Sequence, residues 1–375
     1  MNDETYRKAV ALRHELHRHP ELSCEERWTK RYLMDYIRAN TRHMEVVDRG
    51  RWFYARYRGG EGGKRLAFRA DFDALPIDET ISLPYGSEIP GVAHKCGHDG
   101  HCATLCALIL ETDLRGSPNE LFFIFQHAEE TGVGAKECSV LIDEEGIDAV
   151  YGYHNESGYE RGDILIRDGS MQCASEGMSL YFEGLTSHAS DPGMGRNPTA
   201  AISRLALALP KLYRTEDYTG FVMATVVQVD IGQRQFGTAA SGGVLRLTIR
   251  AQYDEELEKL RKRIADMAHS LSVEYGLVLR TETCEYFPQN CNHKEDNDRI
   301  RAICARLGLP LKEFPFPKNG SEDFGWFTRK TKGAFFNVGN GPDVTAHHTV
   351  TYDFPDEIMK NAELVFEGLA ELNAE

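Results

Sequence analysis

Four apolar, strand-like runs in this chain are each followed closely by side chains that can bind a metal ion. The runs span 66–69, 121–126, 149–153 and 334–338, and the side chains that follow them are Asp71 and Asp73, Glu129 and Glu130, His154, and His347 and His348. The carboxyl ends of strands in an open α/β sheet meet at one edge, where ligands gather. The order of the sequence therefore predicts a sheet that brings these side chains together.

The segment Cys96-Gly97-His98-Asp99-Gly100-His101 adds a thiol, two imidazoles and a carboxylate in a loop before an expected helix. Thiolate, imidazole and carboxylate together suit zinc, manganese, cobalt or nickel. His101 lies one helical turn after His98, and we interpret it as a support or helix cap rather than a ligand. In the pair Glu129-Glu130, one carboxylate can bind a metal while the other serves as a base on water, so the residues indicate a metallohydrolase.

Alternation of strands and helices along the outer parts of the chain predicts an α/β fold, with a mixed, mostly parallel sheet flanked by helices. Helical spacing runs through 4–40 and 101–112, and a last helix is expected over 355–372. The middle of the chain instead has the order β-α-β-β-α-β, which is that of a ferredoxin-like α+β unit. We therefore expect one domain formed by 1–175 and 288–375, with a second domain, 176–287, inserted in it.

Composition narrows the class of protein. The formal net charge of −15 argues against nucleic acid or an anionic membrane as a partner. The acidic start, 1–5, is not followed by the apolar region of a signal peptide, and the apolar stretch 104–110 is too short to span a bilayer. The 9 cysteines are scattered without a paired spacing, as expected for reduced thiols. These features predict a cytoplasmic protein that acts on a small molecule.

A series of motifs stands in order along nearly the whole chain: LHRHPEL (16–22), RADFDALP (69–76), CGHDGH (96–101), FQHAEE (125–130), SHAS (187–190), GSEDF (320–324) and HTVTYDF (348–354). Together they resemble the aminoacylase and carboxypeptidase type of dimetal amidohydrolase. The branch that the chain resembles contains hippurate hydrolase, auxin-conjugate hydrolase and N-acetyl-diaminopimelate deacetylase. The resemblance implies hydrolysis of N-acyl amino acids or related small amides by a metal-activated water.

The resemblance also implies a role for each site residue. The ligands of two divalent ions (zinc, manganese, cobalt or nickel) would be Cys96, His98, Glu130, His154 and His348, with the cysteine shared. Glu129 would be the general base, and Asp71 would orient a ligand. The register to 352–354 favours His348 over His347. The inserted domain would be a lid and dimerisation domain of a homodimer, from which His188 reaches the neighbouring subunit's site and stabilises the oxyanion.

The chain departs from the family pattern at three places. The segment 237–243 stands where relatives have an Asn-x-x-Pro-like sequence, His127 stands where they tend to have proline, and 131–134 replaces a run of glycines. The first departure leaves open how a substrate carboxylate would be held. Arg196 and Arg234 are clamps for it by charge type, although most surface arginines are simply solvated.

Other readings of the same residues remain open. A metallo-dipeptidase or carboxypeptidase would use the same metal site on a substrate with a free amino group. A cysteine-nucleophile hydrolase using Cys96 with His98 would survive metal chelation and be inactivated by alkylation. A dimeric binding scaffold without activity is disfavoured, because Glu129 and every expected ligand are present.

Overall fold

The structure, a computed structural model, describes residues 1–371 of the 375-residue chain. The chain divides into two compact units. The first comprises Met1–Met171, Asn290–Phe316 and the chain from Asp323 onward, and the second comprises Gln172–Gln289 and Pro317–Glu322. Our expected inserted domain, 176–287, does not include Pro317–Glu322, which the structure groups with the second unit. The end of the last expected helix, Leu372, lies outside the described residues.

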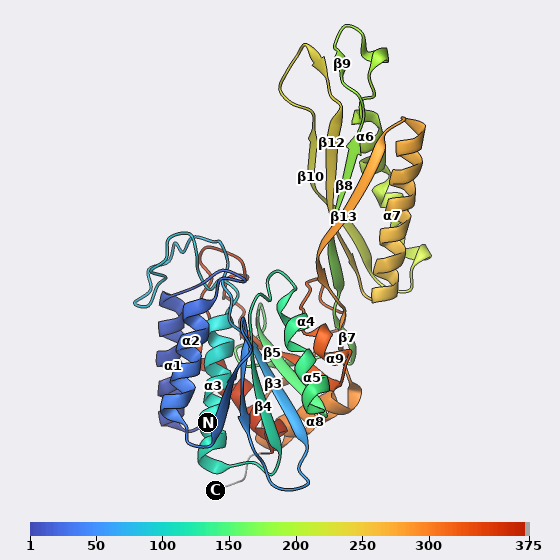
Figure 1. The fold of residues 1–375 in the computed structure, drawn as a ribbon. Coiled ribbons are helices and arrows are strands. Elements are labelled where there is room, and N and C mark those ends of the chain that lie inside the picture. Colours follow the sequence, from blue (N-terminus) through green and yellow to red (C-terminus); the bar gives the residue numbers. More distant parts are fainter. Residues whose placement is uncertain (372–375) are drawn as a thin grey trace. The chain divides into compact units, whose positions relative to one another are not determined.

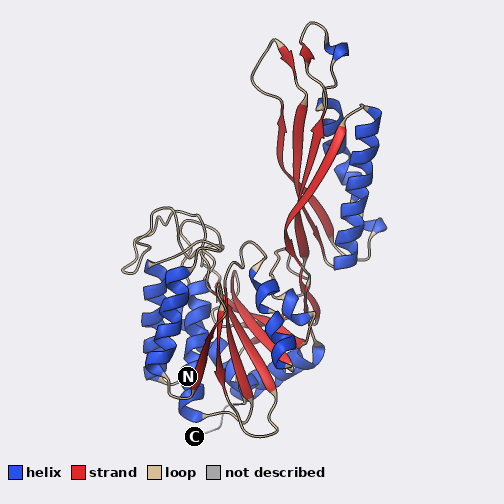
Figure 2. Ribbon diagram, in the orientation of Figure 1, coloured by secondary structure: helices blue, strands red, loops and turns tan. Residues whose placement is uncertain are grey.

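The first unit is built on an eight-stranded sheet with the order β1-β2-β4-β3-β5-β16-β6-β15 (Figures 1 and 2). The pairs β3–β4, β3–β5, β5–β16 and β6–β15 are parallel, and the pairs β1–β2, β2–β4 and β6–β16 are antiparallel. The expected mixed α/β sheet is therefore confirmed. Its strands are β1 (Met44–Asp48), β2 (Phe53–Tyr57), β3 (Arg65–Asp71), β4 (Glu120–Gln126), β5 (Ala149–Ser157), β6 (Ile164–Ile166), β15 (Leu311–Glu313) and β16 (Lys332–Gly341).

Helices cover both faces of this sheet because its central strands are apolar on both sides. In β4, Leu121, Phe123 and Phe125 pack into the core under α1, α2, α3, α8 and α10, while Phe122 and Ile124 pack into the core under α4, α5 and α9. A continuous apolar run is typical of a strand buried on both faces. The helices are α1 (Asp3–Arg18), α2 (Arg27–Asn40), α3 (His98–Arg115), α4 (Gly134–Cys138), α5 (Val140–Glu145), α8 (Lys294–Leu307), α9 (Gly325–Thr328), the 3₁₀ helix η3 (Asp356–Ile358) and α10 (Met359–Ala370).

The expectation of continuous helix through 4–40 is wrong, because α1 and α2 are separated at 19–26. Pro20 has no N–H to donate to a helix. Leu22 instead forms a bridge with Ala74, and the carboxylate of Glu21 accepts hydrogen bonds from the N–H groups of Trp28 and Thr29 at the start of α2. Helical spacing of apolar residues is present on both sides of this break, and Pro20 marks the break in the sequence.

The second unit has a four-stranded antiparallel sheet with the order β10-β12-β8-β13, and α6 and α7 pack on it. Its sequence of elements is the expected β-α-β-β-α-β. The elements are β8 (Ala174–Glu183), β9 (Ser187–His188), η1 (Pro192–Met194), α6 (Thr199–Leu212), η2 (Thr215–Asp217), β10 (Val222–Ile231), β11 (Thr238–Ala239), β12 (Gly242–Ala251), α7 (Asp254–Glu274) and β13 (Val278–Phe287). Two short strands, β7 (Gly169–Gln172) and β14 (Asn290–Asn292), pair where the chain enters and leaves this unit.

Candidate metal centre

The parallel strands place the expected site residues at one edge of the first unit's sheet. Asp71 is the last residue of β3 and is paired with Gln126, the last residue of β4, directly before the Glu129-Glu130 turn. His154 was expected after a strand that ends at 153, but it lies within β5, where it pairs with Asn337 of β16. The strand continues past the histidine because β16 supplies it with a long parallel partner.

The loop that carries Cys96 and His98 can form only because Gly97 joins them. Gly97 has a φ of 107°, in the left-handed region that favours glycine, and a Cβ there would lie 2.5 Å from Oδ1 of Asn155. Helix α3 then begins at His98 and is buried along most of its length. The close approach of the loop to Asn155 brings Cys96 to His154, with 3.3 Å between Sγ and Nε2.

Cys96 stands at the centre of the arrangement because it belongs to two groups of metal-competent side chains. One group is Cys96, His98 and His154, the other is Cys96, Glu130 and His348, and within each the ligand atoms lie within 4.8 Å of one another. A third group, His98, Glu129 and Glu130, joins the first two. The structure thus brings all five expected ligands and Glu129 into one cluster.

The separations between these atoms fit a metal ion. Nε2 of His98 lies 3.8 Å from Oε1 of Glu130, and Nε2 of His348 lies 3.4 Å from the same oxygen. Ligand atoms placed tetrahedrally at about 2.0–2.3 Å from an ion are roughly 3.3–3.8 Å from each other. The donor set of thiolate, imidazole and carboxylate suits a borderline-soft divalent ion.

Nε2 of His98 has the surroundings expected of a ligand atom. The side chain is fully buried, its Nδ1 bonds the backbone carbonyl of Asp73 at 2.9 Å, and no residue in 1–371 hydrogen-bonds its Nε2. A buried polar atom without a partner is costly and rare in proteins. Its carboxylate neighbours are instead 3.8–3.9 Å away, at Asp71, Glu129 and Glu130, and this distance leaves room for a cation between them.

Asp73 holds two of the expected ligands in place. Its Oδ1 lies 3.1 Å from Nδ1 of His98, and its Oδ2 accepts hydrogen bonds from the backbone N–H of Glu130 at 3.0 Å and the hydroxyl of Ser23 at 2.7 Å. Metal-binding histidines usually donate their second ring N–H to such an oxygen. The sequence named Asp73 as one of the metal-competent side chains that follow a strand, and the structure shows that it contacts two expected ligands.

Asp71 and His101 form a buried network beside the cluster. Asp71 accepts a hydrogen bond from Arg69 at 2.6 Å and bonds Nδ1 of His101 at 2.6 Å, while Nε2 of His101 lies 2.7 Å from Oδ1 of Asn155. Both ring nitrogens of His101 are thereby occupied, in keeping with the support role expected for it. His347 faces Nδ2 of Asn155 at 2.7 Å, so the structure groups His348, not its neighbour, with Cys96 and Glu130.

The electrostatics of the cluster favour a bound cation. Burial opposes a charge on His98, yet the nearby Asp71, Cys96 and Asp73 raise its pKa well above its ordinary value. Hydrogen bonds with Cys96 and Glu130 raise the pKa of His348 to about 10. The raised pKa values of these two histidines show that the electrostatic potential at the cluster is strongly negative. A bound divalent cation would neutralise this negative charge.

The same surroundings argue against a cysteine nucleophile. Burial, and then the carboxylate of Glu130, raise the pKa of the Cys96 thiol. A nucleophilic cysteine instead needs a lowered pKa to be a thiolate at neutral pH. A metal ion would deprotonate this thiol, whereas the protein groups around it do not.

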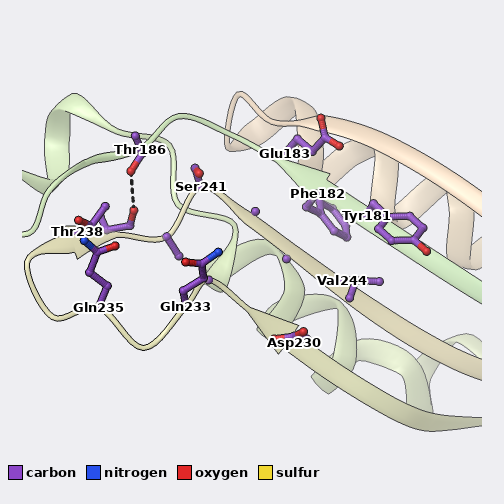
Figure 3. Close-up of a pocket in the computed structure, with 15 residues that line it drawn as sticks. Tyr181, Phe182, Glu183, Thr186, Asp230, Gln233, Gln235, Thr238, Ser241 and Val244 are labelled. Carbon is purple, nitrogen blue, oxygen red and sulfur yellow. Dashed lines mark hydrogen bonds between the residues drawn. The ribbon is translucent and has the colours of Figure 1, made fainter.

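The remaining predicted residues lie in the second unit. His188 ends β9, is exposed, pairs with Thr238 of β11, and its Nδ1 lies 2.7 Å from the hydroxyl of Ser190. Residues 238–243 of the segment that departs from the family pattern line one wall of a cavity of about 590 Å³ (Figure 3). Glu183, Thr186, Asp230, Gln233 and Gln235 line other parts of it, and Arg196 and Arg234 are not among the described residues that line it.

Comparison with known proteins agrees with this site. The sequence model of peptidase family M20/M25/M40 matches residues 67–372, and the chain belongs to this family. An N-acetyl-L-cysteine deacetylase from Bacillus subtilis is 27% identical over 98% of this chain and 88% of its own length. An N-acetyldiaminopimelate deacetylase from Listeria monocytogenes is 29% identical over 90% of this chain and 92% of its own length.

The fold also matches a solved structure. A dinuclear metal binding peptidase of family M20 from Bacillus subtilis has a TM-score of 0.83 with 24% identity, covering 98% of each chain. Among residues 1–371, no helix is both long and apolar enough to cross a membrane, and all nine cysteines are free. The protein is a hydrolase of amide bonds, as the motifs predicted.

Proposed function

We propose that the protein hydrolyses N-acyl amino acids at a centre that holds two divalent metal ions. The observation that carries the proposal is the overlap of two ligand groups at Cys96, one with His98 and His154 and one with Glu130 and His348. Each of these two groups can bind one ion, and the Cys96 thiolate, which belongs to both groups, can be a ligand of both ions. The ions would supply a Lewis acid for the amide carbonyl and lower the pKa of a water molecule.

In this proposal Glu129 moves the proton. Its carboxylate is nearly buried, 6% exposed, and its Oε2 lies 3.9 Å from Nε2 of His98. Adjacent glutamates point in different directions, so Glu130 can bind a metal while Glu129 faces the attacking water. Glu129 would take the proton of that water and deliver it to the departing nitrogen. Asp71 would hold Arg69 and His101 beside the ligands.

The proposed substrate class follows from the relatives. Two of them carry the names of deacetylases of N-acetylated amino acids. His188 would stabilise the oxyanion. We further propose zinc, manganese, cobalt or nickel as the metals, a cytoplasmic location, and a homodimer joined through the second unit.

The experiment that tests this function compares Glu129→Gln with Glu130→Gln. Loss of the base should lower kcat about 10²–10⁴-fold, while elemental analysis finds both metal ions retained. Glu130→Gln should instead lose metal together with activity. Assays with N-acyl amino acids and with dipeptides that carry a free amino group separate the deacylase from the dipeptidase. Full activity of Glu129→Gln, or of the metal-free protein, would contradict the proposal.

A further inference from the structure

The buried lysine next to Cys96 contacts the chain segment that carries His348. Lys95 is fully buried, and its ammonium donates a hydrogen bond to the backbone carbonyl of Tyr352 at 2.8 Å. Its own backbone carbonyl accepts a hydrogen bond from the N–H of His348 at 2.8 Å. One residue thereby holds both ends of the segment 348–352, through its main chain at one end and its side chain at the other.

The charge of Lys95 is balanced by a carboxylate that is itself held from three sides. Its ammonium forms an ion pair with Oε1 of Glu79. The same oxygen bonds Nε2 of His17 in α1 at 2.9 Å, and Oε2 of Glu79 accepts the N–H of Ser87 at 2.8 Å. A buried charge is tolerated when it is paired and hydrogen-bonded, as it is here. The ammonium therefore has a fixed position relative to α1.

His348 depends on its backbone for its position more than the other expected ligands do. Its side chain is 51% exposed, whereas the side chains of His98 and Glu130 are 0% and 13% exposed. Its φ of 61° lies in the left-handed region, which is unfavourable for residues other than glycine. Packing around an exposed side chain does not fix it, so the position of His348 depends on the backbone contacts of 348–352, which include those with Lys95 and a hydrogen bond from the N–H of Thr80 to the carbonyl of Val350.

We infer that Lys95 is a positioning residue, which sets the distance between Cys96 and His348 and thereby the affinity for the metal ion that these two residues share with Glu130. This inference rests on the proposed dimetal function. It assigns to Lys95 an effect on one of the two ions, because the pair His98 and His154 is held by other contacts, from Asp73 and from the backbone carbonyl of Asn155.

The test measures metal binding by the whole protein. The metal-free protein is titrated with Zn²⁺ or Co²⁺ in competition with a chromophoric chelator, which yields both dissociation constants. Lys95→Met removes the ammonium and keeps the length of the side chain, and we expect one dissociation constant to rise about 10-fold or more, as is typical when a support of a ligand is lost. Lys95→Arg should recover part of the affinity.

Two controls separate positioning from a general loss of stability. Arg56→Met removes another largely buried cation from its partner Glu120, at the far end of β4, and should leave both constants unchanged. In a background of His348→Ala, Lys95→Met should cause no further loss of affinity, because the ligand through which it acts is already absent.

Unchanged metal affinity in Lys95→Met would overturn the inference. The inference would also be overturned if Lys95→Met lowered the affinity of the His348→Ala variant by the same factor as it lowers that of the parent. Where Lys95→Met does not fold, Glu79→Gln weakens the same anchor while keeping the shape of the partner, and equal affinity in that variant overturns the inference as well. Failure of the parent protein to bind two ions would instead contradict the proposed function itself, so the two failures are distinguishable.

Discussion

His98 illustrates how a single side chain is prepared to bind a metal ion. One ring nitrogen is bonded to Asp73, while the other is buried without a hydrogen-bond partner among residues 1–371 and faces carboxylates at 3.8–3.9 Å. The cost of leaving such an atom unsatisfied is offset only when a cation is bound. Asp73 holds Nδ1 of His98 and so leaves Nε2 directed toward these carboxylates.

Changing Asp73 to asparagine should weaken metal binding. The amide offers one oxygen where the carboxylate uses two, so either the N–H of Glu130 loses its acceptor or the imidazole of His98 loses its side-chain acceptor and keeps only the backbone carbonyl of residue 73. Loss of such a support typically costs 10–100-fold in metal affinity, which a competition titration measures. Ser23→Ala is the matched control, because it removes the third contact of Asp73 and leaves both ligands held. Equal affinity in Asp73→Asn and the parent would contradict this role.

At the scale of elements, a buried ionic network ties α1 to the loops around the site. Glu79 lies between His17 of α1, Lys95 and the N–H of Ser87. Burial alone would raise the pKa of Glu79, but the hydrogen bonds from His17, Lys95 and Ser87 outweigh it and lower the pKa to about 2. The network therefore stabilises the fold only while this carboxylate is ionised.

This network predicts a loss of stability in acid. The carboxyl of Glu79 is deprotonated at a lower pH in the folded chain than in the unfolded chain, whose pKa is near 4.5. Its contribution is thus complete above about pH 4.5 and disappears as the pH falls toward 2. We expect the free energy of unfolding to lose about 1–3 kcal/mol from this group over that range, and urea unfolding measured at a series of pH values checks it. Glu79→Gln should flatten the dependence, and an equally steep slope in that variant would refute the assignment.

The elements also show where sequence reasoning succeeded and where it stopped. Cys96, Glu130 and His348 could be named as candidate ligands because each belongs to a local motif, and the strands were predicted because their apolar runs are continuous. Pro20 was a local signal of the break between α1 and α2, whereas the bridge that forms there between Leu22 and Ala74 joins distant segments. Asp73 was named as a metal-competent side chain, but the contacts by which Asp73 and Lys95 support the ligands are set by the fold and not by spacing.

At the scale of the molecule, the expected ligands come from distant parts of the chain but all lie in the first unit. A metal ion bound by them links the segments at 96–98, 129–130, 154 and 348. Binding to the folded state alone stabilises it, by about 4 kcal/mol when the free metal exceeds its dissociation constant 1,000-fold. Among the described residues, the two groups that contain Cys96 include none from the second unit.

Removal of metal should therefore change the two units differently. We expect a chelator to abolish activity and to increase hydrogen exchange in β3, β4 and β5 and around His348, while β8, β10, β12 and β13 keep their protection. Mass spectrometry of the exchanged peptides measures both units in one sample, so the second unit is the internal control. Equal loss of protection in both units, or none in either, would be inconsistent with a metal site confined to the first.

The proposed homodimer has a candidate surface in the second unit. β10 is an outer strand of its sheet, and Val226, Val227 and Val229 on it are 41%, 63% and 48% exposed. Exposed apolar side chains on an unpaired edge favour pairing with another chain. Light scattering should give the mass of a dimer for the parent and of a monomer for Val229→Lys. Val278→Lys, on the opposite outer strand β13, should remain dimeric, and a dimer in both variants would exclude β10 as the surface.

The insertion of the second unit has a consequence for synthesis on the ribosome. β5 carries His154 but pairs with β16, which is translated only after the whole of 172–289. Before β16 is translated, β5 has no partner on one side and His348 has not been made. At that stage all four strands of the second unit's sheet, β8, β10, β12 and β13, have already been translated. Since chains are translated at about 5–20 residues per second, the later-made unit can fold first, and the site assembles only when the last strand leaves the exit tunnel.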